Sequence, residues 1–184
     1  MIDLPRATLL ACALAATVAS AAPLKTDTAH SSVKASFKQM NVPIESPFKK
    51  FVATIDYSDK TPDAAKASVE IDVASLDVGD AEMNKEVAKK EWFHAAQFPT
   101  ASFVSTSIKA DGAGKLTVAG KLTIKGKSSD VRFPLTVKQE SGKQVFDGQL
   151  PIKRLAFNIG EGEWKDTSMV ADEVLIKFHV IAGQ

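Results

Sequence analysis

The sequence predicts an all-β protein, a lipocalin-like extended antiparallel barrel of eight strands with one short inserted helix. Apolar residues alternate with polar ones through eight separate runs, turn-forming stretches separate most of these runs, and a helical period replaces the alternation only once. Short turns make neighbouring strands antiparallel, and eight such strands with a continuous apolar face close into a barrel. A two-sheet sandwich is the alternative, and it would need long crossover connections, which the chain offers in only two places.

The clearest strand pair lies in residues 119–137, where two apolar-alternating arms flank a polar stretch. Ile124 in the first arm and Phe133 in the second lie on the apolar face of their strands, while lysine, arginine and threonine occupy the other face. We expect residues 126–130 to form the turn between the arms. Pro134 has no N–H to donate to a sheet, so the second arm is predicted to be an edge strand or to be bulged at that point.

The remaining elements follow from the same alternation. Further strands are predicted in the regions 30–37, 51–57, 69–73, 101–106, 146–152 and 174–180. Between the first two of these, Pro43 and Pro47 are expected to bound a connection. The apolar spacing over residues 80–92 is helical, and Asp80 is placed to cap the N-terminus of a single short helix.

The first 22 residues have the features of a secretory signal. Arg6 precedes a short apolar segment, and small residues up to Ala22 suit cleavage, so we expect residues 1–22 to be removed and residues 23–184 to form one domain. An alternative places a lipoprotein site at Cys12, although the apolar segment continues past that residue. No other window approaches the roughly 20 apolar residues of a spanning helix, so no stable membrane span is expected.

Composition and motifs exclude several function classes. The 23 lysines and arginines nearly balance the 22 aspartates and glutamates, whereas nucleic-acid binding requires a basic stripe. His30, His94 and His179 lie in no metal-ligand spacing, and the chain has neither a G-x-S-x-G nucleophile motif nor a phosphate-binding glycine loop. The acidic cluster from Glu161 to Asp166 is interpreted as a solvated loop. We therefore expect no metal, no cofactor and no enzymatic activity.

Large apolar residues on the inner phase of the strands are the candidate ligand-binding residues. Two interpretations are open, because these side chains could fill a packed core or line an apolar pore. Small residues at other inner positions, such as Ala53 and Gly148, favour a pore, since a barrel with small inner residues must flatten or enclose a cavity. The predicted pore wall consists of Phe37, Phe51, Ile55, Ile71, Phe103, Leu122, Ile124, Val131, Phe133, Leu135, Phe146, Ile176 and Phe178.

An ordered set of short motifs resembles one known family. The motifs are His30-Ser31, Phe48-x-x-Phe51, Trp92-Phe93 followed by the stretch from Phe98 to Phe103, and the stretch from Gly120 to Gly126. Their order is similar to that of the YceI-like proteins, which are secreted bacterial polyisoprenoid-binding proteins. The resemblance covers essentially the whole chain after residue 22. It implies a lipocalin-like barrel, a periplasmic location and an amphiphilic lipid held in an apolar pore, without enzymatic chemistry.

The leading functional hypothesis is a periplasmic carrier that sequesters a long-chain isoprenoid lipid, such as a polyprenyl quinone or its precursor. Each buried methylene contributes about 0.8 kcal/mol, so a prenyl tail leaves a membrane only for another apolar enclosure. A fatty acid or fatty amide is the alternative ligand. A ligand-free, stress-related structural or interaction barrel is the alternative function, and a homodimer is left open.

Overall fold

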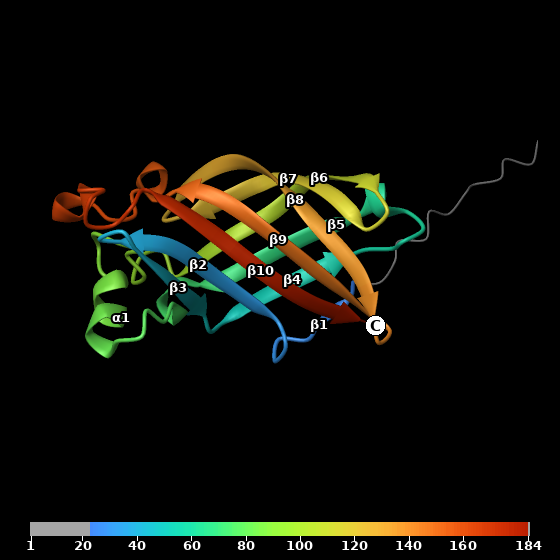
Figure 1. Ribbon diagram of the computed structural model, residues 1–184, viewed down its shortest axis with the longest axis horizontal. Helices are drawn as coiled ribbons and strands as arrows, with labels where there is room; N and C mark the ends of the chain where they lie inside the picture. The colour runs from blue at the N-terminus through green and yellow to red at the C-terminus, as the bar shows by residue number, and fades with distance from the viewer. Residues whose placement is uncertain (1–22, 184) are drawn as a thin grey trace, which may run out of the picture.

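The computed structural model describes residues 23–183, so the predicted signal segment and Cys12 lie outside the described residues. The described chain forms one curled antiparallel sheet of ten strands with a single α-helix at one end (Figure 1). The strands are β1 Lys25–Thr26, β2 Ser32–Gln39, β3 Val42–Phe48, β4 Phe51–Asp56, β5 Lys66–Asp72, β6 Thr100–Gly112, β7 Lys115–Ile124, β8 Lys127–Glu140, β9 Lys143–Lys153 and β10 Glu173–Gly183, and the helix is α1 Ala81–Val87. Short 3-10 turns occur at Pro62–Ala64, Val73–Ser75, Arg154–Phe157 and Gly162–Lys165.

Tight two-residue turns connect three of the strand pairs. These turns are Met40–Asn41, Lys125–Gly126 and Ser141–Gly142, and both residues of each have φ between 47° and 79°. Such left-handed pairs match the right-handed twist of the strands that they join. The predicted turn at residues 126–130 is therefore too long, because Lys125 adopts φ 49° and pairing between β7 and β8 starts at once with Ile124 opposite Lys127.

The strand order is β3-β2-β10-β9-β8-β7-β6-β5-β4, and β1 closes the curl. Lys25 of β1 pairs with Gly183 of β10, and the backbone N–H of Leu24 donates to the Ile55 carbonyl of β4 at 2.7 Å. The N-terminal segment therefore bridges β10 and β4, whereas β3 and β4, the two ends of the strand order, are connected by residues 49–50. All ten strands belong to one sheet, which confirms the barrel and rules out the two-sheet sandwich.

Eight strands were predicted and all eight exist, but the structure adds β1 and β3. The prediction that Pro43 and Pro47 bound a mere connection is wrong, since both lie within β3, which pairs with β2 from Val42 to Phe48. Because β3 is the last strand in the sheet order, its outer edge needs no N–H donors, and proline is tolerated there.

The strand that contains Pro134 is not an edge strand. β8 lies between β7 and β9, and its pairing with β7 extends from Ile124–Lys127 to Lys115–Thr136. Its pairing with β9, however, begins at Glu140–Lys143 and ends at Leu135–Gly148. The proline thus lies where the ladder on one side of β8 stops.

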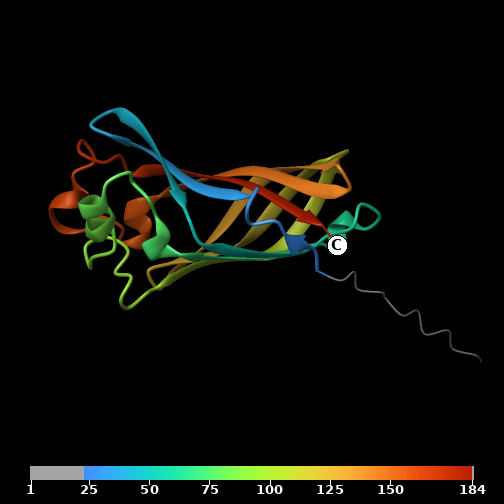
Figure 2. The same ribbon diagram turned by 90° about the horizontal axis from the view of Figure 1, so that it is seen from below.

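The helix confirms its predicted cap and is shorter than expected. The Asp80 carboxylate accepts from the backbone N–H groups of Glu82 and Met83 at 3.0 and 2.9 Å. Residues 88–97 form a series of turns, in which His94 has φ 51°. Figure 2 shows α1 and the segment between β9 and β10 at one end of the barrel, with β1 and the last residues of β10 at the other.

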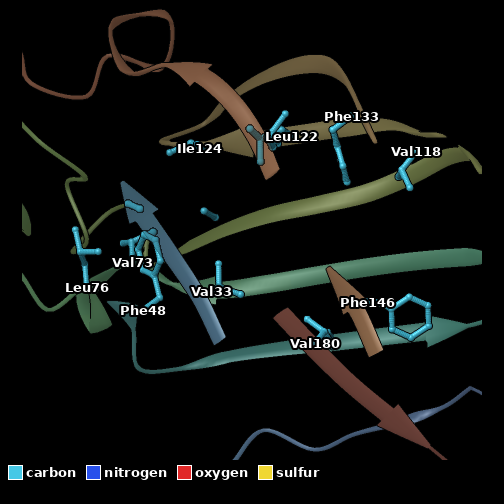
Figure 3. Packing of buried hydrophobic residues seen from close by; sticks show 14 of the residues in the cluster. Val33, Phe48, Val73, Leu76, Val118, Leu122, Ile124, Phe133, Phe146 and Val180 are labelled. Carbon is cyan, nitrogen blue, oxygen red and sulfur yellow. The ribbon is translucent and has the colours of Figure 1, made fainter. Parts of the chain in front are cut away.

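Apolar side chains fill the interior of the barrel (Figure 3). Val118, Leu122 and Ile124 of β7 and Phe133 of β8 are all less than 10 % exposed and belong to one continuous cluster. The inward phase that alternation predicted is thus the phase that the fold buries. No helix in the described part of the chain has the length and apolar character needed to cross a membrane.

Candidate functional site

The barrel encloses an apolar cavity of about 180 Å³. Ten of the predicted pore-wall residues lie on its wall, namely Ile55, Ile71, Phe103, Leu122, Ile124, Phe133, Leu135, Phe146, Ile176 and Phe178. Phe37, Phe51 and Val131 share the inward phase but do not reach the cavity, and they pack half-buried against its outer shell. Whether a ligand touches any of these side chains stays a prediction.

Three phenylalanine rings cross the interior in a row. Phe133 of β8 lies edge-to-face with Phe103 of β6 and Phe178 of β10, at centroid distances of 5.5 and 5.4 Å. Two glycines make room for the outer rings, because a Cβ at Gly120 would lie 2.5 Å from the Phe103 ring and one at Gly148 would lie 2.2 Å from Phe178. The space beside these two glycines is therefore occupied by aromatic rings and does not add to the cavity.

The interior combines features of both predicted alternatives, the packed core and the apolar pore. An engineered cavity of about 150 Å³ holds one benzene molecule, and sites for drug-sized ligands have about 300–1,000 Å³. The lumen of about 180 Å³ is thus real but small. A longer tail would need the row of phenylalanine rings to turn aside, because these rings cross the lumen.

A buried arginine organises the end of the barrel beside α1. Arg154 is 2 % exposed, lines the cavity and has no carboxylate among its hydrogen-bond partners. Its guanidinium donates to five backbone carbonyls, those of Ile159, Gly160, Trp164, Val170 and Ala171, at 2.7 to 3.2 Å. Burial lowers the pKa of Arg154, yet the group stays protonated in proteins. One side chain therefore links residues 159–171, the segment that covers this end of the barrel and that we call the cap.

Aromatic and lysine contacts connect the cap to the rest of this end of the barrel. Trp92 packs against Trp164 with ring centroids 5.3 Å apart, and the Arg154 guanidinium lies 5.7 Å from the Trp92 ring. The Lys125 ammonium donates to the carbonyls of Lys90 and Asn158, both at 2.7 Å. The sequence placed Lys125 on the outer face of its strand, whereas its position in the turn directs the ammonium into the cap.

An aromatic pair lies at the opposite end of the lumen. Tyr57 and Phe146 meet edge-to-face at 5.4 Å, and both line the cavity. Burial and the Asp59 carboxylate raise the pKa of Tyr57 to about 12. The phenol is thus a neutral part of the wall over the physiological pH range.

A second depression, which we call the outer groove, lies on the outside of β2, β3, β8, β9 and β10. Its volume is about 510 Å³, and its lining consists of Ser32, Lys34, Glu45, Pro134, Thr136, Asp147, Gly148, Gln149, Lys177, Phe178 and His179. Lys34 and Lys177 both donate to the Glu45 carboxylate, at 2.9 and 2.8 Å, and they lower its pKa to about 2. His179 forms a 2.6 Å hydrogen bond with Asp147. The groove thus has two ammonium groups, those of Lys34 and Lys177, and two carboxylates, those of Glu45 and Asp147.

Sequence reasoning missed the residues that come from outside the eight predicted strands. Phe48, Phe93, Arg154 and Ile159 all line the cavity. Phe48 belongs to the unpredicted β3, and the other three lie in irregular segments without periodicity. A lone arginine in a sequence is by default a surface residue, so no local signal could have identified Arg154 as a buried clamp.

Titratable residues form no candidate metal centre in the described part of the chain. No group of three or more histidine, cysteine or acidic side chains there could hold a metal ion. Glu161, from the acidic cluster, pairs with Lys125 at 3.0 Å, which lowers its pKa. Glu161 of the acidic cluster therefore forms a structural ion pair with Lys125 in the cap.

Comparison with known proteins agrees with this geometry. The family description "YceI-like domain" matches residues 24–182. The chain belongs to the YceI-like family. Curated relatives named Protein YceI, from Salmonella arizonae and Salmonella paratyphi B, are 40 % identical over 65 residues, which is 35 % of this chain and 34 % of each relative. The matched region thus spans about a third of those relatives.

Several solved structures have the same fold. The Burkholderia cenocepacia protein BcnA is 54 % identical, with a TM-score of 0.84 over 86 % of this chain and 99 % of that one. A Campylobacter jejuni YceI protein is 23 % identical, with a TM-score of 0.67 over 77 % of this chain and 85 % of that one. A polyisoprenoid-binding domain from Saccharophagus degradans is 17 % identical, with a TM-score of 0.65 over 88 % and 97 %. The last two similarities establish the fold alone.

Proposed function

We propose that this YceI-like protein is a periplasmic carrier that binds the isoprenoid tail of an amphiphilic lipid, such as a polyprenyl quinone or its precursor, in the lumen of the barrel. The observation that supports this function most is the enclosed cavity, whose wall comes from every strand except β1 and is apolar throughout its exposed surface. A relative of the same fold is described as a polyisoprenoid-binding domain, which agrees with this choice of ligand.

The free energy of the lumen suits a prenyl chain. Burying one methylene contributes about 0.8 kcal/mol, so one isoprene unit of five carbons contributes roughly 4 kcal/mol when it leaves water. Within the cavity the tail meets only carbon surfaces, and the row of Phe103, Phe133 and Phe178 can turn aside to admit further units. The lumen therefore replaces the bilayer as solvent for the tail.

A ligand-free structural barrel is the second candidate, and the small cavity favours it. A lumen of about 180 Å³ lies below the usual range of ligand sites, roughly 300–1,000 Å³. This candidate predicts that the interior stays filled by its own side chains in the purified protein. A fatty acid or fatty amide would occupy the same lumen and differ only in the identity of the extracted lipid.

The test begins with protein purified from the periplasmic fraction of its host. Extraction with organic solvent and mass spectrometry should yield an isoprenoid lipid, and N-terminal sequencing should start near Pro23. Ligand at about 100 times its Kd stabilises a protein by about 2.7 kcal/mol. For a domain of this size we expect the Tm to rise by roughly 5–10 °C when a polyprenyl quinone is added.

A matched pair of variants on β6 links binding to the lumen. Ala101 is 7 % exposed and lines the cavity, whereas Val104 is 53 % exposed and points away from it. Ala101→Leu should fill the lumen and abolish the Tm gain, and Val104→Leu should retain it. Absence of any extracted lipid together with no Tm gain for the native protein would refute the carrier function and support the ligand-free barrel. A fatty acid in the extract would mean that the ligand is a fatty acid and not an isoprenoid, and the lumen would remain the proposed binding site.

A further inference from the structure

The wall of the barrel is interrupted between β8 and β9. These two neighbouring strands pair only as far as Leu135–Gly148, although β8 continues back to Lys127 and β9 continues on to Lys153. On their other sides both strands remain fully paired, β8 with β7 and β9 with β10. The segments 127–134 and 149–153 thus have no ladder between them.

Pro134 explains where the ladder ends. The Val137 N–H donates to the Gly114 carbonyl on the β7 side, so alternation directs the backbone of the even-numbered residues of β8 toward β9. Continuing the register from Leu135–Gly148 places Pro134 opposite Gln149. Proline has no N–H, so one of the two hydrogen bonds of this pair cannot form, and the ladder between β8 and β9 ends there.

A cross-link of side chains limits the gap at its other end. The Lys127 ammonium donates to the Asn158 side-chain oxygen at 2.9 Å, and the Lys125 ammonium donates to the Asn158 carbonyl at 2.7 Å. Between this link and Pro134 lie about eight residues of strand, which is a length of roughly 25 Å at 3.3 Å per residue. The interruption is therefore bounded and long enough for an extended prenyl chain to pass.

One phenylalanine separates the outside from the lumen at this place. Phe178 and Gly148 line both the outer groove and the inner cavity. The Phe178 ring lies over Gly148, where a Cβ would be 2.2 Å away, and the ring is held by one edge-to-face contact with Phe133. No side chain of Gly148 backs the ring, so its rotation would connect the two spaces.

The outer groove suits a polar head that accepts hydrogen bonds. Lys34 and Lys177 each donate to Glu45, which leaves further N–H donors on both ammonium groups. The Gln149 side chain is exposed at the mouth of the gap and has no hydrogen-bond partner within the described chain. Carbonyl or hydroxyl oxygens of an uncharged head match these donors.

We propose that the wall between β8 and β9 is a lateral portal, through which the tail passes the Phe178 ring while the polar head stays in the outer groove. This proposal rests on the proposed function, that is, on binding of an apolar tail in the lumen. It assigns the outer groove a ligand of defined chemistry, the uncharged oxygen-bearing head of an amphiphile.

The portal can be tested by measuring how fast the protein takes up a ubiquinone with a geranyl tail. Quenching of tryptophan fluorescence monitors this uptake. Phe178→Ala should accelerate association by roughly three- to tenfold, the factor expected from the loss of one edge-to-face ring contact. Val104→Ala is the control, because Val104 is 53 % exposed on β6 and belongs to the lining of neither the cavity nor the outer groove. Its association rate should stay at the native value.

A block of the groove supplies the opposite perturbation. Gln149→Cys carrying a bulky maleimide should slow association by about tenfold or more, while Lys121→Cys with the same label, on the exposed face of β7, should not. Equal association rates in all four variants, or equal acceleration by Val104→Ala and Phe178→Ala, would overturn the portal and leave lumen binding intact. Failure of the native protein to take up any quinone would instead refute the lipid-binding function, and the portal with it.

Discussion

Replacing Arg154 with methionine should lower the free energy of unfolding by about 3–5 kcal/mol, because several buried backbone carbonyls lose a charged hydrogen-bond donor at once. Methionine fills a similar volume but donates no hydrogen bond, so the five carbonyls that the guanidinium contacts at 2.7 to 3.2 Å lose a common donor. Each hydrogen bond to a charged group contributes about 1.5–3 kcal/mol, and the released desolvation cost of the 2 % exposed guanidinium offsets much of the sum.

Urea unfolding followed by circular dichroism measures this loss, and a thermal scan should show a Tm lower by roughly 6–20 °C for a domain of this size. Arg132→Met is the control, because Arg132 is exposed on β8, and we expect a change within about 0.5 kcal/mol. Arg154→Lys should recover only part of the loss, since an ammonium has three donors in place of five. A change below about 1 kcal/mol for Arg154→Met would refute the reasoning, because it would mean that water replaces the guanidinium at these carbonyls.

Three further predictions concern packing and ionisation. Gly120→Ala places a Cβ 2.5 Å from the Val104 carbonyl oxygen, so urea unfolding should show a loss of about 1–3 kcal/mol. Tyr57 is the only tyrosine, and ultraviolet titration of its phenolate should give a pKa near 12, with stability lost as pH rises above its ordinary value of 10. Glu45 and Asp27 have pKa values lowered to about 2 by lysine contacts, so the stability that they contribute should be full above pH 4.5 and disappear as pH falls toward 2 in acid titrations of folding.

The fold could be predicted from the sequence because most of the barrel follows a local rule. Inward and outward residues alternate in every long strand, and Ile124 and Phe133 show that the predicted phase is the buried one. Asp80 capped the helix as expected, because the cap needs only neighbouring N–H groups. β3 escaped prediction because its prolines are acceptable only at an edge, and position in the sheet is not a local property.

The candidate site was predictable only where it repeats the strand pattern. Ten residues of the predicted wall line the lumen, yet Arg154 and Phe93 reach it from irregular segments that fold across the end of the barrel. Pro134 was recognised as a site where hydrogen bonding fails, but its consequence depends on the partner strand, because only the ladder toward β9 is interrupted. The volume of the lumen also depends on rings such as Phe178, which occupy the space left by glycines of other strands.

Closure of the curl by β1 has a consequence for folding. Lys25 and Gly183 pair although nearly the entire described chain separates them, and Leu24 adds the link to β4. Hairpins such as β7–β8 involve neighbours in sequence and form early, whereas contacts between distant segments require the cost of loop closure to be met first. β2 pairs with β10 over a similar separation in sequence, so the seam between the N-terminal strands and β10 carries the largest loop-closure cost in the barrel.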